Sequence, residues 1–416
     1  MYLLSIIGKS VFARCICALS IFAVGILIAR YFGKEGVGIY VFTMAARRLI
    51  FSLSNLGYLS TIVYNFTSDF KMTKNDFLNL LYRVLLLVVF SISFVIVLCH
   101  ILPNDYVEAY LERIYLISVL VVSLFFLTFS FRVASVLKKT NYINAGEVTV
   151  QLSFLTICSS TTFLNFDLNV DNLLLLFFII ELFVAFFLVL LIYHSLPNEK
   201  FNRKEIISIK SVFRYSKWVY VSNWVNNLII DYPVFAMSLA MLPSSAIGVF
   251  SRAMTFINLG RSVINPLSTI LFPFFRKKES NVLKNFFFSI FITVISLLPV
   301  SIFVYVFSKE IISFFYGEEF VSASLYLEIM APVLFLQPFN VLSNVFLVAR
   351  GKAKSVSFFS ALSLLTLIVC SFSLYFDFGV SAFAISILIQ QLTIAFIYLV
   401  LVLRTIVHEG LSFNQE

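Results

Sequence analysis

Arginine side chains lie in the middle of two long apolar segments, where charge is costly and therefore informative. They are Arg47, Arg48, Arg252 and Arg261. A cation inside a bilayer costs about 2.5 kcal/mol or more, so it normally faces a partner or a water-filled cavity. Guanidinium groups bind phosphate oxygens through paired hydrogen bonds. We therefore predict a cationic cavity in which these arginines bind the phosphate groups of a substrate.

The geometry of an ideal helix limits how many of these arginines can face one cavity. Arg252 and Arg261 are nine positions apart, which places them about 180° apart around a helix axis. Both can face the cavity only if the helix is bent or unwound, and Gly260 is the position that would permit this. Arg47 and Arg48 point about 100° apart. Which member of each pair faces the cavity stays open.

Amide and carboxylate side chains form polar stripes on two further apolar segments. The first stripe is Asn223, Asn227 and Asp231, and the second is Gln337, Asn340 and Asn344. We predict that these six residues line the cavity or couple transport to an ion, against the alternative that a polar stripe on one membrane helix serves packing between helices. Asp231 and Glu181 are the carboxylates suited to carry a proton, and Glu181 is expected to form a structural ion pair.

No constellation of residues in the sequence predicts catalysis. The histidines His100, His194 and His408 lie at the ends of apolar segments, where interfacial roles are expected. There is no glycine-rich phosphate-binding loop, so ATP hydrolysis within this chain is not expected. The five cysteines lack metal-ligand spacing. The sequence predicts neither an enzyme nor a metal site nor a cofactor.

The composition is that of an integral membrane protein. Hydrophobic residues make up 61% of the 416 residues and charged residues 12%, which is more apolar surface than a soluble chain of this length buries. A span needs about 20 apolar residues. Twelve such segments lie near 11–33, 37–64, 78–102, 114–137, 147–166, 172–195, 214–241, 245–275, 285–307, 322–349, 354–376 and 379–403. The first lacks a signal-peptide cleavage site and is expected to remain as a helix. The predicted fold class is all-α and polytopic.

The distribution of Lys and Arg predicts the orientation of these spans. On alternate loops, sixteen fall on the side of the amino terminus and three, Lys34, Arg113 and Lys309, on the other side. Because cytoplasmic loops carry the excess of Lys and Arg, both termini are predicted to be cytoplasmic. The same bias accounts for the net charge of +9 without a nucleic-acid partner. The outer loops are short, which disfavours an enzyme that works on that face.

Two short motifs recur in the second half of the chain at nearly one offset. Val37-Gly38-Ile39-Tyr40 is matched by Ile247-Gly248-Val249-Phe250 after 210 positions, and Leu59-Ser60-Thr61-Ile62 by Leu267-Ser268-Thr269-Ile270 after 208. Six predicted helices separate the copies, so both halves share one orientation, as in transporters with parallel repeats. We predict two pseudo-symmetric six-helix lobes, 1–200 and 201–416, with a linker near 196–213. This architecture indicates a transporter that alternates between inward-open and outward-open states.

Four stretches, ordered along residues 10–355, carry a family resemblance. They are Ala29-Arg30-Tyr31-Phe32-Gly33-Lys34-Glu35-Gly36-Val37-Gly38-Ile39-Tyr40; Leu53-Ser54-Asn55-Leu56-Gly57; Ile247-Gly248-Val249-Phe250-Ser251-Arg252-Ala253 with Pro266-Leu267-Ser268 and Leu271-Phe272-Pro273; and Tyr316-Gly317-Glu318-Glu319-Phe320 with Leu347-Val348-Ala349-Arg350-Gly351-Lys352. Their order and spacing resemble the O-antigen flippases, the Wzx-type polysaccharide transporters of the multidrug/oligosaccharidyl-lipid/polysaccharide (MOP) exporter superfamily. The coupling residues of that superfamily's drug and lipid II branches have no clear counterpart here.

The resemblance implies a MATE-like fold with a V-shaped central cavity in the bacterial inner membrane. It implies a flippase that moves undecaprenyl-diphosphate-linked oligosaccharide repeat units to the periplasmic leaflet for O-antigen, lipopolysaccharide or another surface polysaccharide. The four arginines would then bind the diphosphate. Besides membrane lipid, the polysaccharide polymerase and the chain-length regulator are the expected partners.

Two other functions compete with the flippase. One is a cation-coupled multidrug exporter of the same superfamily, whose cationic substrates four arginines would repel. The other is an oligosaccharide polymerase or ligase, which would need a long outer loop. The sugar composition of the repeat unit, the kind of surface glycan, the coupling ion and the oligomeric state are left open by the sequence.

Overall fold

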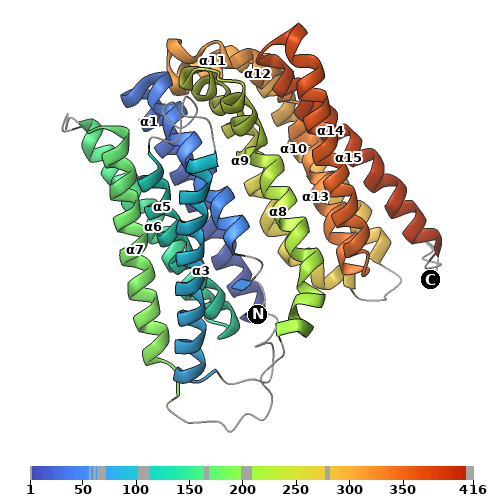
Figure 1. The fold of residues 1–416 in the computed structure, drawn as a ribbon. Coiled ribbons are helices and arrows are strands. Elements are labelled where there is room, and N and C mark those ends of the chain that lie inside the picture. The colour runs from blue at the N-terminus through green and yellow to red at the C-terminus, as the bar shows by residue number, and fades with distance from the viewer. Residues whose placement is uncertain are drawn as a thin grey trace. The chain divides into compact units, whose positions relative to one another are not determined.

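The computed structural model describes residues 2–55, 58, 59, 62, 72–101, 113–163, 168–197, 209–276 and 282–408, and the regular structure within these ranges is helical (Figure 1). The first half of the chain forms α1 (Tyr2–Ser54), α3 (Lys74–Ile101), α5 (Ile114–Val136), α6 (Thr140–Phe163), α7 (Val170–His194) and α8 (Ile209–Leu239). The second half forms α9 (Ser244–Arg276), α10 (Val282–Val306), α11 (Ser308–Tyr316), η2 (Glu318–Phe320), α12 (Ala323–Met330), α13 (Val333–Ala349), α14 (Ala353–Phe378) and α15 (Ser381–His408).

Contacts between residues divide the chain into two compact units. Unit 1 comprises residues 1–227 and 234–244, and unit 2 comprises residues 228–233 and 245–416. Helix α8 therefore contributes residues to both units. The six-helix lobes predicted from the sequence, with a border near residue 200, stay a prediction.

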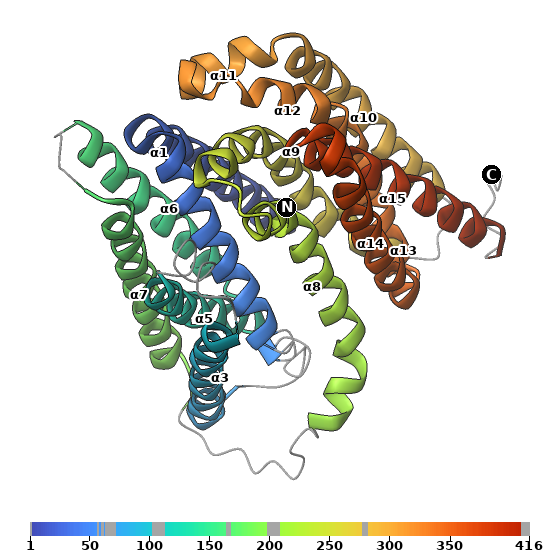
Figure 2. The same ribbon diagram turned by 45° about the horizontal axis from the view of Figure 1, so that its top comes forward.

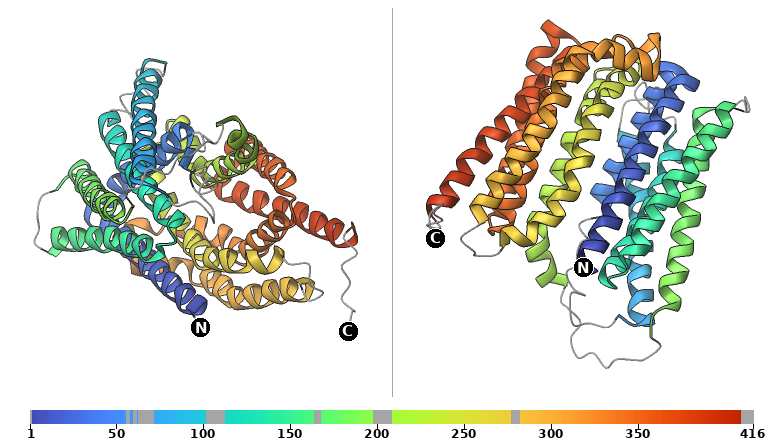
Figure 3. Two further views of the ribbon diagram at one scale, coloured as in Figure 1. Left: turned by 90° about the horizontal axis from the view of Figure 1, so that it is seen from below. Right: turned by 180° about the vertical axis from the view of Figure 1, so that it is seen from behind.

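Helix α1 contains the first predicted span and residues 37–54 of the second. It breaks at Gly33, whose φ of 62° and ψ of −167° are rarely adopted by residues that carry a Cβ atom. Beyond this break the second arm runs back towards the end of unit 1 at which the N-terminus lies (Figure 3). The second arm carries Arg47 and Arg48.

The described helices account for the predicted number of spans. Seven are long and apolar enough to cross a membrane, and the bent pair α12 and α13 makes an eighth. Helices α6, α8 and α9 also have sufficient length, with 24, 31 and 33 residues, but carry more polar side chains. With the bent pair counted once, these eleven elements and the extra arm of α1 coincide in position with the twelve predicted segments. The polytopic all-α fold class is confirmed.

The tenth predicted span, near 322–349, is broken rather than continuous. Helices α12 and α13 meet at an angle of 48° around Ala331 and Pro332. The Ser301 hydroxyl on α10 donates a hydrogen bond of 2.7 Å to the Ala331 carbonyl, so the backbone oxygen at the bend has a partner. Within unit 2, α11 and α12 cross one end of the longer helices (Figure 2). Bent and interrupted helices in transporters often border binding sites.

Each unit has its own apolar core, and its remaining apolar surface faces outwards. Phe77, Phe125 and Phe129 are fully buried in unit 1, as are Phe275 and Phe286 in unit 2. The helices α3, α10 and α14 expose large apolar side chains along much of their length. This exposure suits contact with lipid, as the nearly uniform apolar sequences of these three segments predict.

Candidate functional site

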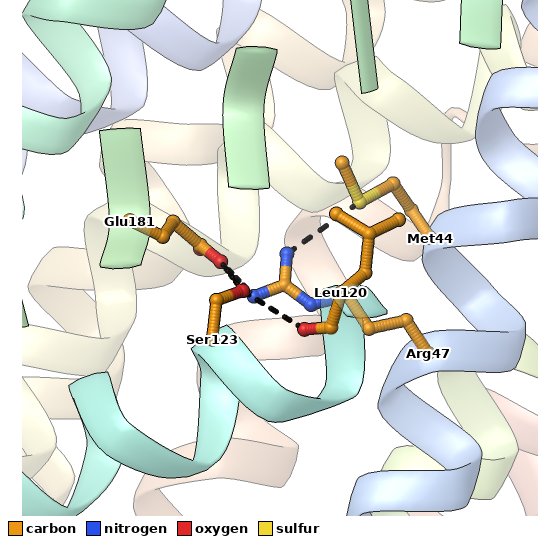
Figure 4. Close-up of polar contacts among 5 residues, drawn as sticks. All are labelled: Met44, Arg47, Leu120, Ser123 and Glu181. Carbon is orange, nitrogen blue, oxygen red and sulfur yellow. Dashed lines mark hydrogen bonds and ion pairs between the residues drawn. The ribbon is translucent and has the colours of Figure 1, made fainter. Parts of the chain in front are cut away.

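Arg47 lies in the interior of unit 1 and has an acidic partner. Its side chain is 4% exposed, and its guanidinium forms an ion pair with the Glu181 carboxylate on α7 (Figure 4). The Ser123 hydroxyl on α5 lies 2.7 Å from Glu181 Oε2, within hydrogen-bond reach, and also 3.0 Å from the Leu120 carbonyl. We call Arg47, Ser123 and Glu181 the Arg47 cluster.

The Arg47 cluster is neutral overall and joins three helices of unit 1. The guanidinium also packs over the Phe177 ring, 5.3 Å from its centroid, which adds a cation–π contact. The expectation that Glu181 forms a structural ion pair is therefore confirmed. Its neighbour Arg48 is exposed on the same arm of α1. In this pair, Arg48 is thus the member that can meet a ligand from solvent.

Arg252 in unit 2 is also buried, at the start of α9. Its guanidinium lies over the ring of Tyr316, 5.3 Å from the centroid. Burial raises the pKa of the Tyr316 phenol, and the positive charge of Arg252 opposes that shift. The ring and the guanidinium thus meet as a neutral aromatic and a cation.

Arg261, on α9, borders a cavity inside unit 2. The cavity measures about 20 Å³, enough for one water molecule. Its lining residues come from α8, α9, α13 and α15: Ile229, Ile230, Met254, Ile257, Asn258, Arg261, Val333, Gln337, Ile387, Gln390 and Gln391. None of these lining residues is acidic. We call this the Arg261 cavity.

A chain of amide groups forms one wall of the Arg261 cavity. Asn340 Nδ2 on α13 donates to Gln391 Oε1 at 2.7 Å, and Gln391 Nε2 donates to Gln390 Oε1 at 3.0 Å. Gln390 Nε2 in turn donates to the Ser363 hydroxyl on α14. Because these bonds join three helices, the polar wall is held in place by its own network.

Gly260 allows α13 to approach α9 beside this cavity. A Cβ atom at position 260 would lie 2.7 Å from Leu334 Cδ2 and 3.3 Å from Gln337 Oε1. The Gln337 side chain therefore packs directly on the glycine that precedes Arg261. Helix α9 is continuous at Gly260, so it shows no unwinding there that would turn both Arg252 and Arg261 to one cavity. Gly260 provides space instead.

The remaining predicted site residues are spread over both units. Asp231 is buried in the unit 2 part of α8, whereas Asn227 is exposed in the unit 1 part. Asn344 Nδ2 donates to the Tyr398 hydroxyl at 3.1 Å and does not line the Arg261 cavity. The side chain of Asn223 lies outside the described residues. Their predicted roles in coupling or cavity lining stay predictions.

Three polar residues of the Arg261 cavity were not selected from the sequence. They are Asn258, Gln390 and Gln391. A signal existed: two adjacent glutamines interrupt the apolar segment 379–403, and Asn258 precedes Arg261 by three positions, close to one helical turn. Within the described ranges, no group of three or more His, Cys, Asp or Glu side chains could hold a metal ion.

Comparison with known proteins identifies the fold. The sequence profile of the MatE family matches residues 276–373, from the end of α9 into α14. No curated protein sequence matches the chain. An inward-facing multidrug resistance MATE transporter of the MOP superfamily superposes with a TM-score of 0.70 and 14% identity, over 96% of this chain and 99% of that structure.

Two further solved structures extend this likeness. The lipid II flippase MurJ, in an inward closed conformation, superposes with a TM-score of 0.69 and 15% identity, over 97% of this chain and 88% of MurJ. A MOP transporter from Pyrococcus furiosus is described as having a binding pocket of reverse polarity that suggests a different function. It superposes with a TM-score of 0.69 and 15% identity, over 98% of this chain and 96% of that structure. The chain is a multi-span membrane protein with the fold of MOP-superfamily transporters.

Proposed function

We propose that this protein is a flippase for a lipid-linked oligosaccharide in the bacterial inner membrane. By alternating access, it moves undecaprenyl-diphosphate-linked repeat units from the cytoplasmic to the periplasmic leaflet for O-antigen or another surface polysaccharide. Both termini face the cytoplasm in this proposal. The polysaccharide polymerase receives the product, together with the chain-length regulator. The protein binds and moves its substrate without changing its covalent bonds.

The charge of the Arg261 cavity is the observation that carries this proposal. Arg261 lines a cavity whose other lining residues are amides and apolar side chains, so no carboxylate of the lining neutralises its charge. Hydrogen bonds between a guanidinium and an anionic oxygen are worth about 1.5–3 kcal/mol each. A diphosphate is the anion that a lipid-linked oligosaccharide carries. Arg252 supports the site from a buried position on the same helix, α9. The part of Arg47 and Arg48 of unit 1 in substrate binding stays a prediction from the sequence.

A multidrug exporter is the competing function, and two observations favour it. One is the likeness in fold to a multidrug resistance MATE transporter. The other is Asp231, a buried carboxylate on α8, which could hold a coupling cation or a cationic drug. Cationic drugs, however, would meet the charge of Arg261 in the cavity. The reverse polarity described for the Pyrococcus furiosus transporter supports the idea that this fold serves substrates of either charge.

Deletion of the gene in its native host tests the proposal. We expect the ladder of surface polysaccharide to disappear while complete lipid-linked intermediate accumulates on the cytoplasmic face of the inner membrane. Expression of the wild-type chain from a plasmid should restore the ladder. Drug susceptibility is measured in the same strains, because deletion of a drug exporter would raise susceptibility without altering the polysaccharide.

The opposite pattern would reject the flippase. If the ladder persists and sensitivity to cationic drugs rises, the protein exports drugs. If single repeat units reach the periplasm without being polymerised, the polymerisation step has failed instead of translocation. Either result excludes the substrate proposed here.

A further inference from the structure

One buried oxygen beside Arg261 lacks a hydrogen-bond donor. Gln337 is 2% exposed, and its Nε2 donates to the Ile257 carbonyl at 3.3 Å. Its Oε1 atom has no hydrogen-bond partner within the part of the chain that the structure describes. The reverse orientation of the amide would direct Oε1 at a carbonyl oxygen, so the bond to Ile257 fixes which atom is unpartnered. A buried acceptor without a donor is costly and calls for an explanation.

This oxygen and the Arg261 guanidinium belong to the same cavity. Gln337 and Arg261 both line it, and Gln337 Oε1 lies 3.3 Å from the position that a Cβ atom of Gly260 would take. Asn258 lines the same cavity and is exposed, so this part of the lining lies at the surface of unit 2. The site thus offers cationic donors and a buried acceptor side by side.

Few ligands match both features. The diphosphate diester of a lipid carrier is anionic at neutral pH but has no hydrogen to donate to Gln337. A neutral sugar has hydroxyl donors but no charge for Arg261. A glycosyl phosphate has both, because the sugar bonded to the phosphate carries hydroxyl or acetamido groups next to the anionic oxygens. Site selectivity of this kind is strong, since a buried polar group rejects ligands that leave it unpaired.

We propose that the Arg261 cavity binds the glycosyl phosphate part of the substrate, with Arg261 on a phosphate oxygen and Gln337 Oε1 accepting a hydrogen bond from the adjacent sugar. This rests on the proposed flippase function and adds that unit 2 recognises the first sugar of the repeat unit. The enclosed space of about 20 Å³ holds one polar substituent. The sugar ring therefore occupies the exposed side, at Asn258.

Binding of small probes to the full-length protein in lipid nanodiscs tests this inference. The probes are glucose 1-phosphate, N-acetylglucosamine 1-phosphate, dimethyl phosphate and free N-acetylglucosamine, and isothermal titration calorimetry gives their dissociation constants. Dimethyl phosphate is an anion without a hydrogen to donate. We expect at least one sugar phosphate to bind about tenfold more tightly than dimethyl phosphate, as one added hydrogen bond allows. The free sugar should bind weakest of the four.

Two substitutions separate the two halves of the site. Q337L should abolish the preference for sugar phosphate over dimethyl phosphate and leave the binding of dimethyl phosphate unchanged. R261Q should weaken the binding of both kinds of anionic probe by about tenfold or more. If Q337L fails to fold, Q337M keeps the length of the side chain and removes the acceptor. Gln151→Leu on α6 of unit 1, a half-buried amide outside the cavity, is the matched control and should change neither constant.

The inference is overturned if the sugar phosphates and dimethyl phosphate bind equally to the wild type, or if Q337L and Q337M keep a preference for sugar phosphate. Gln337 Oε1 would then be satisfied by water alone. Failure of the flippase proposal looks different, because deletion would leave the polysaccharide ladder intact whatever the probes bind. A lost ladder without sugar preference leaves the flippase standing and removes only the sugar subsite.

Discussion

Arg47 in unit 1 and Arg261 in unit 2 both lie on long, largely apolar helices, yet the surroundings of their charges differ. The Arg47 guanidinium meets the Glu181 carboxylate and the Phe177 ring inside the protein. Arg261 faces a cavity without a lining acid. The comparison teaches that depth in a membrane helix does not by itself assign an arginine to substrate binding. The location of the counter-charge decides between structure and function.

The energetics of the two sites follow from this difference. A buried ion pair contributes little net stability, but removal of one partner leaves an uncompensated charge in an apolar interior. Unit 1 is therefore vulnerable at Glu181, where the protein supplies the anion. In unit 2 no acidic residue lines the Arg261 cavity, and the proposed anion is the substrate. Substitution of Arg261 should therefore affect ligand binding and leave the folded unit intact.

Loss of Glu181 should have the largest effect. E181L leaves the Arg47 charge buried and unpaired, so we expect a loss of about 3–5 kcal/mol of stability. Thermal unfolding of the purified protein in detergent, followed by circular dichroism, measures it. The double variant R47M/E181L removes both charges and should recover most of the loss. If E181L unfolds at the wild-type temperature, the Arg47 cluster is not a structural ion pair.

Substitution of Arg261 should have the next largest effect, and on transport only. R261Q removes charge-assisted hydrogen bonds, so we expect translocation of lipid-linked oligosaccharide in reconstituted vesicles to slow roughly 10- to 100-fold. The melting temperature should stay within about a degree of the wild type. Arg132→Gln, at an exposed arginine on α5, is the control and should transport normally. Equal losses in both variants would refute a specific role for Arg261.

Charged and polar residues are rare in apolar segments and therefore stand out in the sequence. Arg261 and Gln337 were both selected in this way, and the break between the first two predicted spans coincides with Gly33. The positions of the helices also follow from apolar run lengths. These features are local, so they can be read from neighbouring residues.

Pairing between distant residues could not be predicted from the sequence. Arg47 and Glu181 are 134 positions apart, and no periodicity connects them. The contact between Gln337 and the backbone at Gly260 depends on how closely α9 and α13 approach, which the missing Cβ atom permits. The amides Gln390 and Gln391 were not selected from the sequence, and only the fold brings Gln391 within hydrogen-bond distance of Asn340.

Alanine at Gly260 should give a smaller effect that also separates the two units. The added Cβ atom would crowd Leu334 and displace Gln337 Oε1, so we expect a severalfold rise in the KM for lipid-linked oligosaccharide and a stability loss of about 1 kcal/mol. G146A on α6 is the matched control, because its Cβ atom would meet Phe131 at 2.8 Å. That variant should lose similar stability at an unchanged KM. A rise in KM for both would show that crowding anywhere slows transport.

Removal of the Ser301 hydroxyl should give the smallest effect. Its hydrogen bond to the Ala331 carbonyl supports the bend that positions Val333 and Gln337 in the cavity wall. Single hydrogen bonds between membrane helices contribute about 0.6 kcal/mol on average, so S301A should lower thermal stability only slightly. Because the bond stabilises the geometry of the wall, S301A should also weaken probe binding to the Arg261 cavity by less than G260A does. S313A, on α11, removes an exposed hydrogen bond to Glu318 in η2 and should change neither property. A stability loss as large as that of E181L would mean that the bend, like the Arg47 cluster, is essential to the fold, and that unit 2 also depends on a buried polar contact of its own.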